Sequence, residues 1–298
     1  MAGTAVGDVK SAARPLVKTL LTILLVIVAA LIALGMHAVL PAKVDEARLD
    51  GFLVEQYGFV PVAAAYFFIL LAHVAVVLIL NRRNLLRPRL GAAFLLGLSF
   101  ALIYMIGMQE IVLGASPYEK WGAQFLLYQL LMGIGDAIPA VLLSLLVGRL
   151  FFREIGDTVR KMDRGAVLTV LLFTVIVGTV RLLAYLGGAI ENELAAYPAP
   201  VALWSYLLGL MLGISYLLIS QTTLAKARTM LLGVGVNWMI FNVFIGLVKK
   251  DTMADSLLRG AIDMVAIAIA MGLSAMVGRS SLGRSAAALS GPMPDSKD

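Results

Sequence analysis

The chain has 298 residues, of which 61% are hydrophobic and 14% are charged, and its net charge is +6. Soluble globular domains carry about 45–50% apolar and about 25% charged residues, so this composition excludes a soluble domain, a disordered chain and a coiled coil and predicts a polytopic membrane protein. The chain has no cysteine, which excludes disulfides, thiolate metal sites and cysteine nucleophiles.

Eight stretches are long and apolar enough to form membrane-spanning helices, which need about 20 such residues each. They cover residues 17–40, 59–81, 90–113, 121–148, 166–190, 200–221, 229–248 and 257–278. The first stretch exceeds the apolar core of a cleavable signal peptide, so we interpret it as a retained span. The predicted fold class is therefore all-α, a polytopic transmembrane helical bundle of eight spans.

Lysine and arginine are distributed unevenly between the two ends of the predicted spans. The N-terminal segment 1–16 with Lys18, the loops 82–89, 149–164 and 222–228, and the tail carry 17 of the 24 basic residues, whereas the opposite loops carry 5. Because basic loops stay in the cytoplasm, this asymmetry predicts a cell inner (plasma) membrane protein with both termini cytoplasmic.

Two segments on the basic side have distinct compositions. The connector 149–164, from Arg149 to Arg164, predicts an amphipathic helix at the membrane interface, and alternatively a contact for a cytoplasmic or membrane protein partner. The tail 280–298 is rich in Ser, Ala, Gly and Pro and is expected to be disordered. The bilayer is the expected partner, and no aromatic-interleaved basic stretch indicates nucleic-acid binding.

The two halves share short motifs that suggest a duplication of a four-helix unit, 17–148 and 165–279. Ser144 to Arg149 (SLLVGR) ends the fourth span, and Ser274 to Arg279 (SAMVGR) ends the eighth. An even number of spans per unit would give a parallel repeat with a pseudo-twofold axis along the membrane normal. The alternative is chance similarity among common apolar residues.

Four ionisable residues lie within predicted spans, namely Asp136, Arg181, Asp263 and His73. A charge inside the membrane costs at least about 2.5–3.5 kcal/mol on insertion scales and is therefore expected to be paired. Arg181 and Asp263 lie at similar depths, which predicts an ion pair. Asp136 is deeper and is expected to stay protonated or to contact Arg181. Such a pair either fixes helix packing or forms an ion, proton or anionic-substrate site.

Three other features of the spans bear on helix packing and on a possible site. Pro139 frees the carbonyl of Gly135 beside Asp136, a feature of cation and proton sites in broken helices, or simply of a kinked helix. Asn237 and Asn242 either join helices by hydrogen bonds or line a cavity. Gly209 and Gly213 form a GxxxG face that allows close helix approach.

The sequence predicts transport of a small solute or ion, or a permease subunit, because it lacks motifs for common enzymes and has no soluble domain. No cofactor or metal site is predicted, since His37 and His73 lie too far apart along their spans to share a haem iron. A transporter should have a cavity reaching Asp136. The alternatives are an intramembrane enzyme on lipid-linked substrates, with polar residues gathered around Glu110, Glu191 and Asp263, and a scaffold subunit.

Overall fold

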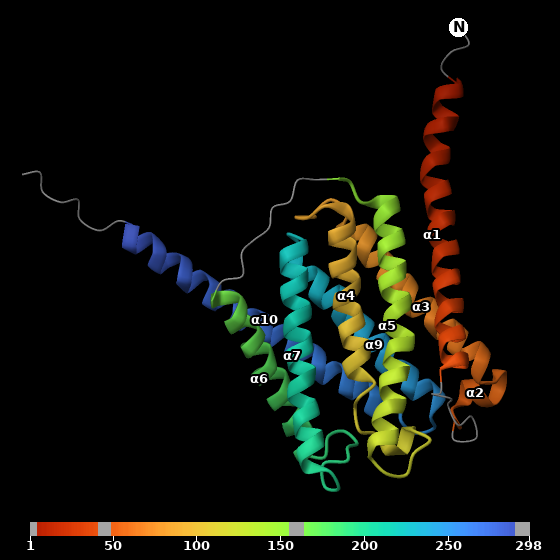
Figure 1. Ribbon diagram of the computed structural model, residues 1–298, viewed down its shortest axis with the longest axis vertical. Helices are drawn as coiled ribbons and strands as arrows, with labels where there is room; N and C mark the ends of the chain where they lie inside the picture. Colours follow the sequence, from red (N-terminus) through yellow and green to blue (C-terminus); the bar gives the residue numbers. More distant parts are fainter. Residues whose placement is uncertain (1–4, 41–48, 155–163, 290–298) are drawn as a thin grey trace, which may run out of the picture.

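The computed structural model describes residues 5–40, 49–154 and 164–289, and these residues contain helices and no strand. The elements are α1 (Ala5–Val39), α2 (Phe52–Tyr57), α3 (Phe59–Asn81), α4 (Arg89–Gly107), η2 (Leu113–Ala115), α5 (Ala123–Phe151), α6 (Arg164–Leu186), α7 (Pro198–Thr222), α8 (Lys226–Arg228), η3 (Thr229–Gly235), α9 (Val236–Val248) and α10 (Met253–Leu289). Figure 1 shows them as one bundle, which α10 crosses obliquely.

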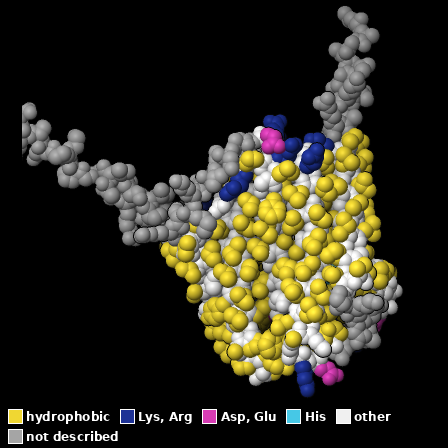
Figure 2. Space-filling model, in the orientation of Figure 1, with side chains coloured by type: hydrophobic (Ala, Val, Ile, Leu, Met, Phe, Trp, Pro, Cys, Tyr) yellow, Lys and Arg dark blue, Asp and Glu magenta, His cyan; other side chains and the backbone are white. Residues whose placement is uncertain are grey.

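Eight helices of the described residues are long and apolar enough to span a membrane, as the sequence predicts. The seventh span combines α8, the π-helix η3 and α9 from Lys226 to Val248. A π-helix of this kind is rare, and it often occurs at functional positions. Figure 2 shows hydrophobic side chains covering the wall of the molecule and Lys and Arg side chains gathered at one end. We call this end the basic side and the other end the opposite side.

Local sequence explains where several helices begin and end. Gly58 separates α2 from α3 with a φ of +80°, a conformation that glycine adopts without steric cost. Gly188 follows α6 with a φ of +63°, and Pro198 starts α7, where its missing amide hydrogen costs nothing. α5 continues past Pro139 to Phe151, so the proline is inside a continuous helix.

The helices of each half contact one another in similar pairs. α1 packs against α3 and α5, and α6 packs against α7 and α10. α4 packs against α5, as α9 packs against α10. Between the halves, α4 contacts α7 and α3 contacts α9. The core therefore lies where α3, α4, α7 and α9 meet.

Close helix contact depends on small residues, as expected for the Gly209–Gly213 face. A Cβ atom at Gly209 would lie 2.7 Å from the backbone carbonyl oxygens of Phe173 and Thr174 in α6. A Cβ atom at Gly213 would lie 3.0 Å from the nearest α6 atoms. The predicted close approach of helices at this face is confirmed.

On the basic side, the loop after α3 is joined to the loop after α7. The amide of Leu86 donates to the carbonyl of Thr222 over 2.9 Å. The side chain of Asn81 accepts hydrogen bonds from Thr223 (3.0 Å) and Thr229 (2.8 Å). These bonds connect the first half of the chain to the second.

Two predicted segments are only partly described. Of the connector 149–164, residues 149–151 complete α5 and residues 155–163 lie outside the described residues. α10 reaches Leu289, so residues 280–289 are helical rather than disordered as expected from composition. Alanine is the strongest helix former, and residues 286–288 are all alanine. Residues 290–298 are not described.

Candidate functional site

Arg181 of α6 and Asp263 of α10 form a buried ion pair inside the bundle. The Arg181 Nη2 atom lies 3.0 Å from Asp263 Oδ2, and both side chains are 0% exposed. The indole nitrogen of Trp238 donates to the same carboxylate oxygen over 2.7 Å. The ion pair predicted from the depths of the two residues is confirmed.

The guanidinium of Arg181 is held mainly by rings and by charge. It lies 5.6 Å from the ring centre of Tyr185 and 5.4 Å from that of Trp204. Glu110 Oε2 is 3.5 Å from Nη2. No nitrogen of this guanidinium makes a well-aligned hydrogen bond to another described residue. Arg181 therefore keeps hydrogen-bonding capacity in a buried position.

Glu110, just beyond the end of α4, extends this pair into a larger group of charges. Its carboxylate accepts short hydrogen bonds from Arg259 Nη1 and from the Tyr185 hydroxyl. Arg259 also binds Asp255 Oδ2, with its Nη2 at 2.8 Å. We call Glu110, Arg181, Asp255, Arg259 and Asp263 the charge cluster. It contains two cations and three carboxylates from α6, α10 and the segment just after α4.

A pocket of about 370 Å³ reaches the charge cluster near the opposite side of the bundle. Glu110, Asp255, Arg259 and Asn242 are among the residues that line it. Arg259 Nη2 also donates to the backbone carbonyl of Glu191 over 2.7 Å. Polar groups thus gather around Glu110 and Glu191, as the enzyme alternative requires, and they lie next to the buried pair.

Asp136 has a different partner from the ones expected. Its Oδ1 atom lies 2.8 Å from His37 Nε2, at the end of α1, and Asp136 is only 2% exposed. Of the two alternatives given for Asp136, the contact with Arg181 is wrong, because α5 packs against α1 while Arg181 lies between α7 and α10. The His37 ring stacks on Phe67 with centroids 5.3 Å apart. A Cβ atom at Gly135 would lie 2.8 Å from this imidazole, so glycine makes room for the pair.

His73 and Asn237 belong to a third polar group, in the middle of the bundle. His73 Nε2 lies 3.0 Å from the carbonyl of Leu232 in the π-helix, and its Nδ1 lies 3.2 Å from Asn237 Nδ2. Asn237 also accepts a short hydrogen bond from the Tyr104 hydroxyl and donates to the carbonyl of Leu70 over 3.1 Å. Asn237 thus joins three helices, in agreement with the helix-joining interpretation.

Asn242 lines a cavity, the second alternative considered for it, and its amide hydrogen bond stays within its own helix instead of joining two helices. Its amide donates to the carbonyl of Trp238, one turn earlier in the same helix, over 2.8 Å. The cavity that it lines is the pocket beside the charge cluster. The six predicted site residues therefore fall into three polar groups rather than one centre.

Sequence reasoning named Glu110 only for the enzyme alternative and did not predict it, Arg259, Tyr185 or Trp238 as partners of the buried pair. Glu110 and Arg259 lie near the ends of their helices, where charges are ordinarily explained by contact with water. Tyr185 and Trp238 carry no charge and look like core residues. The signal for Glu110 and Arg259 was their similar depth on the same side of the membrane, which is the argument that paired Arg181 with Asp263.

No cluster of three or more histidine or acidic side chains suited to a metal ion occurs in the described parts of the chain. The chain was compared with models of protein families, with curated proteins and with solved structures, and none of them matches it.

Proposed function

We propose that this multi-pass membrane protein transports a small solute or ion, with the charge cluster and the Asp136–His37 pair as two separate polar sites on its path. The observation that carries the proposal is the fully buried Arg181–Asp263 pair, whose guanidinium has unused hydrogen-bond donors. Ionisable groups at such depth are expensive, and they typically mark ion, proton or substrate paths.

The pocket on the opposite side supports this proposal because it supplies a route to the charge cluster; Asp136 is not among its lining residues, so it is not the cavity reaching Asp136 that the sequence predicts for a transporter. It reaches Glu110, and Glu110 lies 3.5 Å from Arg181. A solute entering the pocket would meet Glu110 and Arg259 first and would compete for their mutual contacts. Because Glu110 also contacts Arg181, binding would then change the charge around the buried Arg181.

The pair of Asp136 and His37 supports a role for protons in the proposed transport. Asp136 faces His37 rather than lipid, and a contact with bare lipid would have argued against transport. Chains of acidic and histidine side chains carry protons in many pumps and transporters.

Flux measurements in proteoliposomes test the proposal. Vesicles with a trapped pH-sensitive dye are challenged with monovalent cations, carboxylates, amino acids and sugars. We expect one class to cause a pH change in protein-containing vesicles and none in empty ones. Arg181→Gln should abolish the flux, and Asp136→Asn should uncouple it from protons. Arg149→Gln, an exposed charge outside both groups, is the matched control. A response unchanged in all three variants would overturn the proposal.

The second candidate is an enzyme that acts on lipid-linked substrates, and the gathering of Glu110, Arg259 and the Glu191 carbonyl favours it. Against the enzyme stands the engagement of the Glu110 carboxylate, which already accepts hydrogen bonds from both Arg259 and Tyr185. Lipid extracts of cells with and without the chain, compared by mass spectrometry, separate the two candidates. A lipid that changes with the wild type but not with Glu110→Gln would favour the enzyme.

We also propose that the chain lies in the plasma membrane, with its basic side and both termini facing the cytoplasm. The excess of Lys and Arg on that side supports this orientation. Single cysteines introduced at positions 83 and 119, on opposite sides, test it. A membrane-impermeant thiol reagent applied to intact cells should label only position 119.

The two halves are proposed to be a duplicated four-helix unit. The pairs α1–α5 and α6–α10 correspond, and each carries one buried contact between ionisable side chains, His37–Asp136 and Arg181–Asp263. The hydroxyls of Ser144 and Ser274, in the matching motifs, both donate over 2.7 Å to the carbonyl four residues earlier. Co-expression of the two halves as separate chains tests whether each is a folding unit.

A further inference from the structure

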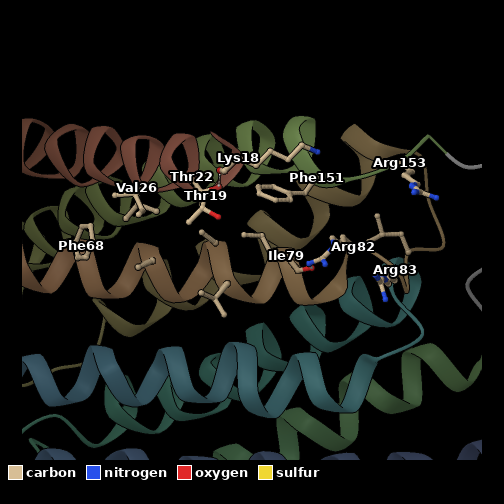
Figure 3. A pocket seen from close by; sticks show the side chains of 15 residues that line it. Lys18, Thr19, Thr22, Val26, Phe68, Ile79, Arg82, Arg83, Phe151 and Arg153 are labelled. Atoms are coloured by element: carbon tan, nitrogen blue, oxygen red, sulfur yellow. Dashed lines mark hydrogen bonds between the residues drawn. The ribbon is translucent and has the colours of Figure 1, made fainter. Parts of the chain in front are cut away.

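A groove of about 1010 Å³ runs between α1 and α3 on the basic side (Figure 3). Its deep part is apolar and is lined by residues such as Val26, Phe68 and Ala72. Val76 in its wall is 52% exposed in the isolated chain. Because α1 and α3 are long and apolar enough to span a membrane, the apolar part of this groove is expected to face the hydrocarbon of a bilayer.

The shallow end of the groove is strongly basic. Its 15 lining residues include Lys18, Arg82, Arg83 and Arg153 and no acidic residue. Figure 3 shows these four side chains at one end of the groove and Phe68 toward the other. Within the described part of the chain, none of the four cations forms an ion pair with a carboxylate.

Two of these cations are held in place by the fold. Lys18 Nζ donates to the carbonyl of Leu150, at the end of α5, over 3.1 Å and lies 5.4 Å from the ring centre of Phe151. Arg82 Nη1 donates to the carbonyl of Ile79 over 3.0 Å. Glu154, the residue after Arg153, forms an ion pair with Arg89 over 2.8 Å. Its charge is therefore balanced outside the groove, and the groove stays positive.

The length of the groove matches one leaflet of a bilayer. Phe68 and Arg83 are fifteen positions apart in sequence, which is about 22 Å at a helical rise of about 1.5 Å per residue. Half of a bilayer, with its headgroup layer, is about 20–22 Å thick. A lipid with its phosphate beside the arginines would therefore place an acyl chain along Ala72 and Val76.

We infer that this groove is a binding site for an anionic phospholipid, with the phosphate held by Lys18, Arg82, Arg83 and Arg153 and one acyl chain lying between α1 and α3. Basic pockets between spans on one side of a membrane typically bind such headgroups. The small side chain of Ala72 leaves the room for the acyl chain. The inference does not depend on the transport proposal.

Native mass spectrometry of the full chain in detergent tests the inference. The probes are phosphatidylglycerol, phosphatidylcholine and inorganic phosphate. We expect retained phosphatidylglycerol and little phosphatidylcholine or phosphate. Each basic side chain near a membrane surface contributes enough to change affinity about fivefold, so Arg82→Gln with Arg83→Gln should weaken binding about thirtyfold. Arg153→Gln, a single substitution at an exposed position, should weaken phosphatidylglycerol binding about fivefold. It replaces the double variant in the test if the double variant does not fold.

Two further variants distinguish a lipid site from a simple anion site and from an effect of general surface charge. Ala72→Phe fills the apolar part without changing charge and should also displace phosphatidylglycerol. Arg149→Gln, also on the basic side but outside the groove, should bind as the wild type does. Binding that survives Ala72→Phe, with equal binding of inorganic phosphate, would overturn the inference in favour of a simple anion site. An equal loss in Arg149→Gln would overturn it in favour of general surface charge.

Discussion

Removing the buried ion pair one residue at a time and then as a whole should separate a structural role from a functional one. The variants are Arg181→Met, Asp263→Leu and the double variant with both substitutions. Each single substitution leaves the other charge buried, whereas the double substitution leaves neither. Glu110 keeps Arg259 and Tyr185 as partners in all three proteins.

The structure sets the expected size of each effect. Arg181→Met leaves Asp263 with only the indole of Trp238, so we expect a loss of about 3–5 kcal/mol, as for other broken buried pairs. Asp263→Leu leaves Arg181 with two aromatic rings and Glu110 at 3.5 Å, so we expect a smaller loss of about 2–3 kcal/mol. The double variant loses mainly the acceptor of Trp238, about 1–3 kcal/mol. The two single losses together should therefore exceed the loss in the double variant by about 2–7 kcal/mol.

Unfolding in detergent by titrated dodecyl sulfate, followed by circular dichroism, measures these differences. Flux in proteoliposomes is then measured on the double variant, which is stable enough to insert. Loss of flux with restored stability would assign the pair to transport. Retained flux would assign it to helix packing. Single losses that simply add up in the double variant would refute the pairing argument itself.

Three smaller predictions concern individual contacts. Gly135→Ala brings a Cβ atom within 2.8 Å of the imidazole in the histidine–aspartate pair and should lower stability by about 1–3 kcal/mol in the same unfolding assay. Gly209→Ala, 2.7 Å from backbone carbonyls that cannot rotate away, should cost at least as much, while Gly91→Ala, with no atom within 4 Å, is the control and should be neutral. Equal unfolding midpoints for all three proteins would contradict the packing argument. The hydrogen bond from the Lys250 amide lowers the pKa of Asp50 from its ordinary 3.8, so its stabilisation is present above pH 3.8 and is lost as the pH falls through the lower folded value. The melting temperature of Asp50→Asn should lie below that of the wild type at neutral pH, and the gap should close in acid; a gap that widens in acid would contradict this sign.

The sequence was sufficient to predict the fold class and the ion pair between Arg181 and Asp263. Hydropathy locates spans because the bilayer imposes their length. Depth along a span pairs Arg181 with Asp263, since an ion pair needs its two ends at the same level. Neither quantity says which helices are neighbours around the bundle.

This missing lateral information explains the main error in the site. Asp136 could be paired by depth with several residues, and only the packing of α1 against α5 selects His37. The π-helix at 229–235 was also not foreseen. It depends on one extra residue per turn of backbone, which hydropathy does not register.

The contacts of Glu110 have a consequence for motion. The His37–Asp136 and Arg181–Asp263 pairs each lie within one half of the chain, whereas Glu110, just after α4 of the first half, contacts Arg181, Tyr185 and Arg259 of the second. On the basic side, Asn81 and its threonine partners make the corresponding junction. A rocking motion that opened the bundle on the opposite side would have to release Glu110 and could pivot about Asn81. Two carboxylates would then act as latches, Glu110 and also Asp50, which binds the Lys250 amide on the same side, and each half would swing with its own buried pair intact.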